Sequence, residues 1–289
     1  MRQGLQNVVL VCPDNDAESR MILLLAYELC SRLGMVIIRS SQAHGATLDR
    51  EPGGIVDLIH ATGKHEVWIV EIPGVQIEEA LDHNGMEVVI IDHHTYGELD
   101  RSKDADGQML PSSLHQFLKL ADIRPHELTR NGFKPRLVRG VGILDARFAQ
   151  GLRAEGYSLE EIREVLDFRR DHAMAGNPDF KKAQEAARGS WENRQHLDEY
   201  TIVRSNTDIS IRGAVSTITI YEDCDTQPLI VEEYEATEIF VQNVDPSVVS
   251  LLKSAIPEGF TFGEGRCWGV NNKRSGTTYT LDHILGVLS

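Results

Sequence analysis

The chain has 289 residues, of which 41% are hydrophobic and 25% charged, as in globular proteins and unlike disordered, collagen-like or coiled-coil chains. Its 44 Asp and Glu residues outnumber its 29 Lys and Arg residues, so the formal net charge is −15. A surface this acidic repels long nucleic acids and anionic membranes. It accepts a small anionic ligand only where a bound metal or a few bases reverse the local charge.

The first half of the chain alternates short Val- and Ile-rich runs with helical patterns. The apolar runs predict strands at 7–12, 35–38, 67–70 and 87–91. Between them the spacing predicts helices that each stop at a glycine, over 17–33, 54–62 and 76–84. Continuous apolar runs are typical of strands covered on both faces, and strands joined by helices form parallel sheets. We therefore predict an α/β domain over 1–157, with a parallel sheet and helices on both faces.

The second half predicts a connector and a smaller domain. The pattern from 112 to about 148 is mostly helical, and Ser158-Leu159-Glu160-Glu161 is a capping box that opens a further helix. Because the helical stretch over 158–196 is polar, we interpret it as a solvated connector. A mixed α/β C-terminal domain is expected over 197–289, with a helix at 246–255. Its strands are expected at 200–203, 209–211, 215–221, 229–231 and 239–241.

Cysteine usage and the N-terminus favour a cytoplasmic protein. The four cysteines form no CxxC pair, which excludes a disulfide framework and a zinc ribbon. The N-terminus lacks the pattern of a signal peptide, and the longest apolar run, 21–26, is far too short to span a bilayer.

Acidic residues and histidines follow the predicted strands. They are Asp14 and Asp16, Glu71, the run Asp92-His93-His94 and, after the apolar run 140–144, Asp145. Ligands in open α/β sheets bind beyond the carboxyl ends of the strands, so these groups are expected to converge there. Carboxylates packed together repel unless a cation lies among them. Taken singly, Asp14 and Asp16 could instead cap the next helix, and Glu71 could be a surface acid.

Carboxylates with imidazoles form a mixed oxygen and nitrogen ligand set. Such a set suits Mn²⁺, with Mg²⁺ or Co²⁺ as alternatives, better than a metal selected by thiolates. The metal would polarise a phosphoryl oxygen and lower the pKa of a bound water, making it a nucleophile. The acids therefore predict a metal site with hydrolytic chemistry.

The motifs over residues 5–150 resemble those of the DHH phosphoesterase superfamily, which includes RecJ-type nucleases, nano-RNases and exopolyphosphatase-like proteins. Asp92-His93-His94 resembles the name-giving motif, Asp14-Asn15-Asp16-Ala17 the first motif, and Gly142-Ile143-Leu144-Asp145 the fourth. Glu71 stands where the second motif has an Asp. The resemblance implies a C-terminal domain that closes over a cleft and carries basic phosphate-binding residues.

The resemblance also implies which residues bind the metals and which ligand is missing. Two metals bridged by the second-motif acid are usual in the family, and the better site carries over here as Asp16, Glu71, His93 and Asp145. The other site keeps Asp14 but lacks its histidine, because Leu10 stands at that position. We therefore expect one tightly bound ion. The candidate catalytic residues are Asp14, Asp92 and His94.

The substrate is expected to be small and to carry phosphate. Lys273, Arg274 and Arg266 lie in an acidic C-terminal region and are candidate phosphate-binding residues, as is Arg147 two residues after Asp145. The family's GGGH motif is absent. The sequence thus predicts a hydrolase of phosphoester or phosphoanhydride bonds in a short oligonucleotide, nucleotide phosphate or polyphosphate. The alternative is a catalytically impaired relative that binds or senses a nucleotide. A homodimer is one oligomeric state left open.

Overall fold

The chain forms two compact units, residues 1–176 and 177–289, in a computed structural model. The structure describes residues 1–42, 47–51, 54–96, 99–173, 179–224, 226–234, 237–262 and 265–288. The division separates the two helices of the predicted connector: α7 (Leu159–Ala173) belongs to the first unit and α8 (Asp179–Glu192) to the second. The predicted domain boundaries at 157 and 197 stay predictions.

The first unit is built on a four-stranded parallel sheet, as predicted. Its strands lie in the order β2-β1-β3-β4, and their bounds are Val36–Ser40, Val8–Pro13, Glu66–Val70 and Glu87–Ile91. Every residue of β1 and β3 is buried, because both are central strands with neighbours on either side. All four strands end on one edge of the sheet, because all run parallel.

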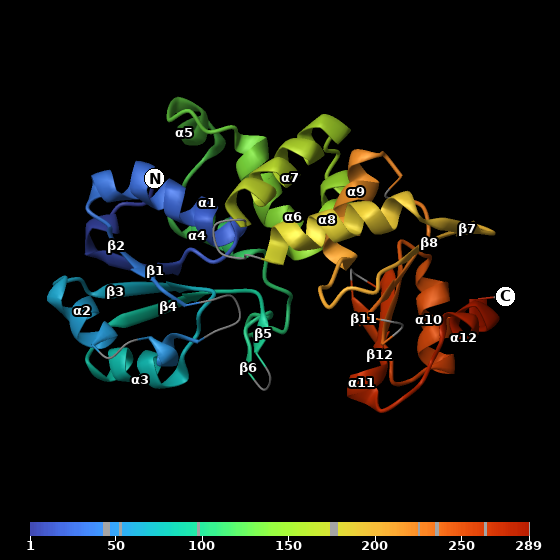
Figure 1. Ribbon diagram of the computed structural model, residues 1–289. Coiled ribbons are helices and arrows are strands. Elements are labelled where there is room, and N and C mark those ends of the chain that lie inside the picture. The colour runs from blue at the N-terminus through green and yellow to red at the C-terminus, as the bar shows by residue number, and fades with distance from the viewer. Residues whose placement is uncertain are drawn as a thin grey trace. The chain divides into compact units, whose positions relative to one another are not determined.

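Helices cover both faces of this sheet (Figure 1). α2 (Ile55–Ala61) and α3 (Val75–His83) share a core with the side chains of Val9, Val11 and Ile69. On the opposite face lie α1 (Ala17–Leu25) and α4 (Ser113–Leu120), where Trp68 of β3 meets Phe117 of α4 edge-on. α1 continues through a π turn (Ala26–Cys30) and a 3-10 turn (Ser31–Leu33), which confirms the predicted helical segment 17–33.

Further elements surround this core. Two 3-10 turns occupy Leu5–Asn7 and Leu48–Arg50, and a small hairpin pairs β5 (Thr95–Tyr96) with β6 (Leu99–Asp100). α5 (Pro125–Arg130) precedes α6 (Pro135–Ala154), which is kinked at Phe148, where the backbone is not helical. α7 packs against α6 and α1. The helix predicted from the capping box at Ser158 is thereby confirmed.

The apolar run before Asp145 is helix, which confirms the helical pattern predicted over 112–148 and corrects the expectation that Asp145, like the other acids, follows a strand. Residues 140–144 belong to α6, and their glycines let α6 approach its neighbours closely. A Cβ atom on Gly142 would collide with Ser112 Oγ and lie 3.0 Å from His115 Nδ1 of α4. Asp145 is therefore placed by helix packing, not by strand pairing.

The second unit contains a six-stranded mixed sheet in the order β11-β12-β10-β9-β8-β7. The strands are β7 (Gln195–Leu197), β8 (Tyr200–Arg204), β9 (Leu229–Glu233), β10 (Glu238–Gln242), β11 (Phe260–Phe262) and β12 (Cys267–Asn271). Among the described strand pairs of this sheet, β8 and β9 are parallel and the others antiparallel. Alternate residues face opposite cores: Ile239 and Val241 contribute to one, and Phe240 to the other.

Helices pack on both faces of this sheet as well. α10 (Pro246–Ala255) and α12 (Leu281–Leu288) cover one face, and α8 and α9 (Arg212–Tyr221) the other; α11 (Asn272–Ser275) is a single turn. The strands predicted at 209–211 and 215–221 were wrong, because 212–221 is helix α9 and 209–211 is not strand. The β-branched composition of that segment favours strand. Its apolar side chains at 211, 215 and 218 nevertheless follow helical spacing and pack on the sheet.

In the described part of the chain, every helix is too short or too polar to cross a bilayer.

Replacing Gly142 with Ala is expected to destabilise the first unit by about 1–3 kcal/mol, because the new methyl group overpacks the α4–α6 contact. Urea denaturation should show a lower midpoint with an unchanged slope. Gly189→Ala is the matched control, because Gly189 lies within α8 and a Cβ there meets no atom within 4 Å. That variant should gain roughly 0.5–1 kcal/mol from the better helix propensity of Ala. Equal stability of the two variants would contradict the packing argument.

Candidate metal centre

The carboxyl edge of the parallel sheet gathers the predicted acids and histidines. Asp14 and Asp16 follow β1, Glu71 follows β3, and the run Asp92-His93-His94 follows β4. Asp145 reaches the same place from the middle of α6. Strand topology thus brings most of the groups together, and one packed helix adds the last.

Four side chains form a group that fits a metal ion. Glu71, His93, His94 and Asp145 each offer one ligand atom, and these atoms all lie within 4.8 Å of one another. His93 Nε2 is the central atom, 3.0 Å from Asp145 Oδ2 and 3.8 Å from Glu71 Oε1. His94 Nε2 lies 4.0 Å from the same Asp145 oxygen. The Asp145 side chain keeps 30% of its surface exposed, so the group is open to solvent.

Asp92 orients the His94 imidazole and holds the backbone of both histidines. Its side chain is buried, and Oδ1 accepts hydrogen bonds from the backbone N–H groups of His93 and His94. The same oxygen lies 3.0 Å from His94 Nδ1, which leaves Nε2 of that ring for the cluster. Gln116 of α4 donates to the Asp92 carbonyl at 2.7 Å. Such support of metal-binding histidines fixes their tautomer and direction.

Glu71 adopts a backbone conformation that a glutamate rarely takes. Its φ of +53° lies in the left-handed region, which costs of order 1 kcal/mol or more for a residue other than glycine. Its N–H donates to the carbonyl of Ile91, so pairing with the end of β4 holds the turn. Strain of this kind concentrates at functional sites, where the surrounding fold maintains it.

Glu18 is a member of the site that the sequence did not reveal. Its side chain is fully buried in the first turn of α1, and Oε1 accepts a hydrogen bond from the N–H of Leu114. Oε2 lies 3.3 Å from His93 Nε2. A glutamate in the first turn of a helix is normally exposed and interacts with the helix dipole. No sequence signal distinguishes this one, because its burial depends on α4 packing against α1.

The electrostatics of the cluster favour a positive charge among the carboxylates. Burial and the negative charges of Asp16, Glu18 and Asp145 raise the pKa of Glu71 well above its usual range. Burial also raises the pKa of Glu18. Burial alone would lower the pKa of His93, but hydrogen bonds to Asp145 and Glu18 outweigh it and raise the pKa to about 10. A nearby cation stabilises crowded carboxylates. Together with the two imidazoles, these carboxylates form a donor set that fits a divalent metal.

Asp14 and Asp16 have other contacts and are not among the four clustered ligands. Asp16 is the N-cap of α1, with Oδ1 accepting from Ser19 N at 2.8 Å, which confirms the capping alternative for Asp16 but not for Asp14. It also lies near enough to Glu71 to raise that residue's pKa. Asp14 accepts from Arg20 Nη1 at 2.8 Å and is 2.6 Å from Arg39 Nη2. Metal ligation by Asp14 and Asp16 stays a prediction.

The predicted phosphate-binding bases are divided between the two units. Arg147 is on α6, where Nη2 lies 2.8 Å from Glu155 Oε1. Arg266, Lys273 and Arg274 are exposed in the second unit, the last two on α11. Their roles in substrate binding stay predictions.

The chain matches no protein family profile and no curated protein sequence. Among solved structures it is similar to an exopolyphosphatase-related protein from Bacteroides fragilis, with 12% identity, a TM-score of 0.43, and coverage of 97% of this chain and 89% of that one. It is also similar to a DHH domain described as a member of a family of ribosomal proteins, with 13% identity, a TM-score of 0.46, and coverage of 98% and 85%. A third is exonuclease RecJ bound to manganese, with 15% identity, a TM-score of 0.37, and coverage of 93% and 87%.

The second of these neighbours is described as a DHH domain. Because the identities and TM-scores are low, the activity of this chain has to follow from its own site.

Asp92→Ala is expected to weaken Mn²⁺ binding about 10- to 100-fold, because the His94 ring loses the carboxylate that orients it and both histidines lose the acceptor of their backbone N–H groups. Titration calorimetry with Mn²⁺ measures the change. Asp82→Ala, which removes an exposed carboxylate from α3, is the matched control and should bind like the wild type. Unchanged affinity in Asp92→Ala would show that Asp92 does not support the site.

Proposed function

We propose that the protein is a metal-dependent hydrolase of phosphoester or phosphoanhydride bonds in a small substrate. The observation that carries this proposal is the group of Glu71, His93, His94 and Asp145 at the carboxyl edge of the parallel sheet. Open α/β sheets bind their ligands at this edge. The candidate substrates are a short oligonucleotide, a nucleotide phosphate or a polyphosphate, each small enough to avoid the repulsion that a net charge of −15 imposes on long nucleic acids.

Glu71, His93, His94 and Asp145 would hold the metal, with Mn²⁺ the favoured ion because oxygen and imidazole ligands dominate. When bound, a divalent ion polarises a phosphoryl oxygen and makes a bound water acidic enough to be a nucleophile at neutral pH. We expect one tightly bound ion per chain. Leu10, where the resemblance implies a histidine for a second ion, is fully buried in β1 and has no ligand atom.

The protein's own groups have distinct tasks in this proposal. Asp92 keeps Nε2 of His94 directed toward the cluster through the contact at His94 Nδ1. Glu18 stabilises the position of His93 through its buried carboxylate. Asp145 is the most exposed of the acids around His93, so it is the carboxylate that a substrate phosphate and its attacking water would meet first.

A second candidate function is nucleotide binding without turnover. Leu10 and Glu71 favour it, since both depart from the motif pattern of the catalytic family that the sequence resembles. This alternative predicts that a nucleotide binds the protein while a broad panel of phosphate esters stays intact. Recovery of activity in Leu10→His would support it.

Hydrolysis of phosphate esters and anhydrides is expected to require Mn²⁺ and to fall at least about 1000-fold in His93→Ala or Asp145→Ala, because each variant removes a ligand. A colorimetric phosphate and nitrophenol assay measures it, with metal content determined on the same samples. Asp82→Ala again serves as the control. Full wild-type activity in the presence of a chelator would contradict the proposal.

A further inference from the structure

Arg169 lies on the face of α7 that otherwise buries apolar side chains. Ile162, Val165 and Leu166 form this face, and none of them is more than 2% exposed. Arg169 follows Val165 and Leu166 at spacings of four and three residues, which keep side chains on one side of a helix. Its own side chain is half-buried. A charged side chain on a buried helix face is usually paired, so the partner of Arg169 has to be identified.

Within the described part of the chain, Arg169 has no hydrogen bond and no ion pair. Its guanidinium carbon lies 5.6 Å from the centre of the Phe148 ring, which is a cation–π contact. Contact with a ring face uses none of the five N–H donors of a guanidinium group. The N–H donors of Arg169 therefore stay available for a ligand.

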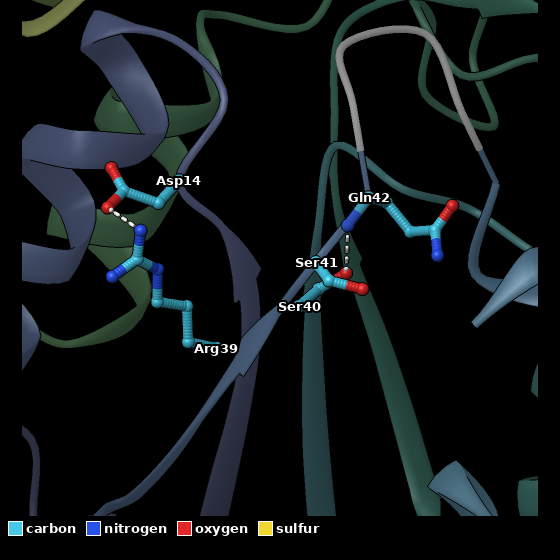
Figure 2. Close-up of a pocket in the computed structure, with 5 residues that line it drawn as sticks. All are labelled: Asp14, Arg39, Ser40, Ser41 and Gln42. Carbon is cyan, nitrogen blue, oxygen red and sulfur yellow. Dashed lines mark hydrogen bonds and ion pairs between the residues drawn. The ribbon is translucent and has the colours of Figure 1, made fainter. Parts of the chain in front are cut away.

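Three other arginines of the first unit already contact carboxylates. Nη1 of Arg20 and Nη2 of Arg39 lie 2.8 and 2.6 Å from Asp14 Oδ2, and Figure 2 shows the contact with Arg39. Nη2 of Arg147 lies 2.8 Å from a glutamate oxygen. An added anion would compete with these carboxylates for their arginines. At Arg169 it would meet no such competitor among the described residues.

The negative charges of the metal centre reach Arg169. Burial lowers the pKa of Arg169, and the charges of Asp145 and Asp16 oppose that effect. An arginine nevertheless stays protonated at neutral pH. Asp145 is one of the four clustered ligands and is 30% exposed. Arg169 is thus a desolvated cation near the solvent-open side of the cluster.

Phe148 links Arg169 to the segment that carries Asp145. Phe148 follows Asp145 by three residues and has a φ of +54°, which kinks α6. For a residue other than glycine, such a conformation costs roughly 1–3 kcal/mol and persists only where packing maintains it. Gly140 lets the two helices pack closely, since a Cβ atom there would lie 2.6 Å from Val165 Cγ2. The packing of α6 on α7 therefore holds the guanidinium group near Asp145.

We propose that Arg169 is a catalytic residue that donates hydrogen bonds to the phosphoryl group undergoing hydrolysis at the metal centre. This inference rests on the proposed function and deepens it. Leu10 offers no ligand for a second ion, because it is an apolar side chain buried in β1. The guanidinium group of Arg169 supplies a second positive charge beside the single ion.

The task of Arg169 is electrostatic and involves no proton transfer. Hydrolysis forms a bond between the water oxygen and phosphorus, and it breaks the bond from phosphorus to the leaving oxygen. The water loses a proton to solvent, and the leaving oxygen gains one from solvent. Charge on the non-bridging oxygens is stabilised in the transition state by donors that are already in place. The planar fork of an arginine can contact two oxygens of one phosphoryl group.

The kinetic test separates the chemical step from metal binding. Wild type, Arg169→Ala and Arg169→Lys are assayed with Mn²⁺ on bis-p-nitrophenyl phosphate and on tripolyphosphate. Arg169→Ala should lower kcat about 100- to 1000-fold with little change in KM, because a transition-state donor is lost. Its Mn²⁺ affinity, measured by titration calorimetry, should equal that of the wild type. Arg169→Lys should fall between, since it keeps the charge and loses the fork.

Chemical rescue distinguishes a catalytic arginine from a structural one. Guanidinium chloride at a non-denaturing concentration should restore part of the kcat of Arg169→Ala and leave the wild type unchanged. The matched control is Arg170→Ala on the same helix, whose arginine is paired with Asp167 at 2.7 Å; its kcat and KM should equal those of the wild type. Loss of Mn²⁺ affinity in Arg169→Ala without rescue would overturn the proposal. Should Arg169→Ala not fold, wild-type kcat in Arg169→Lys would overturn it equally.

A binding measurement separates failure of this inference from failure of the proposed function. Orthovanadate, which adopts the five-coordinate geometry of a phosphoryl transition state, is titrated calorimetrically into the full-length protein with Mn²⁺. Arg169→Ala should bind it about 10-fold or more weakly than the wild type and Arg170→Ala, because a hydrogen bond to a charged group is lost. If this difference persists while no substrate is hydrolysed, the proposed function fails and the role of Arg169 in phosphoryl binding stands. If hydrolysis requires Mn²⁺ but Arg169→Ala behaves like Arg170→Ala throughout, the inference about Arg169 alone is wrong.

Discussion

The crowding of carboxylates around His93 is the constraint on which this site depends. Glu18 and Glu71 are buried and Asp145 is partly so, and all three lie within 4 Å of one imidazole nitrogen. Buried carboxylates are tolerated only with a compensating charge or with raised pKa values, and both occur here. A protonated His93 supplies that charge within the protein itself. A divalent cation would replace the proton and let the imidazole act as a ligand.

The fold meets this constraint by using rigid elements from separate parts of the chain. Parallel strands bring Glu71 and the Asp92-His93-His94 run to one edge, with the strained turn at Glu71 held by pairing to β4. Helix α6 brings Asp145 to the same point because its glycines allow close packing on α4 and α7. Two acids hold the histidine rings: Asp92 contacts the ring of His94, and Glu18 of α1 contacts the ring of His93. Preorganisation of this kind reduces the free energy that ligand binding would otherwise lose in ordering the site.

An acidic protein can bind an anion only where the local charge is reversed. The net charge of −15 is set by the whole surface, but a ligand senses mainly groups within about a Debye length, roughly 10 Å. At the carboxyl edge of the sheet, Asp14 is paired with Arg20 and Arg39, while Glu18, Glu71 and Asp145 surround His93. The basic side chains thus lie beside the end of β1, and the cluster that fits a metal ion lies at the ends of β3 and β4.

Local sequence patterns were enough to predict the parallel strands, the helices between them, and the acids and histidines at strand ends. Those patterns are continuous apolar runs, glycine stops, and polar residues placed directly after a strand. The same patterns misassigned 215–221, where β-branched composition concealed a helical spacing, and placed Asp145 after a strand.

Three features of the site became visible only in the folded chain: Glu18 joins the cluster, Asp145 arrives on a helix, and Arg39 contacts Asp14. Each depends on contacts between segments distant along the chain: α1 with α4, α6 with α4 and α7, and β2 with β1. Such contacts are determined by packing and strand order, which local sequence periodicity does not predict.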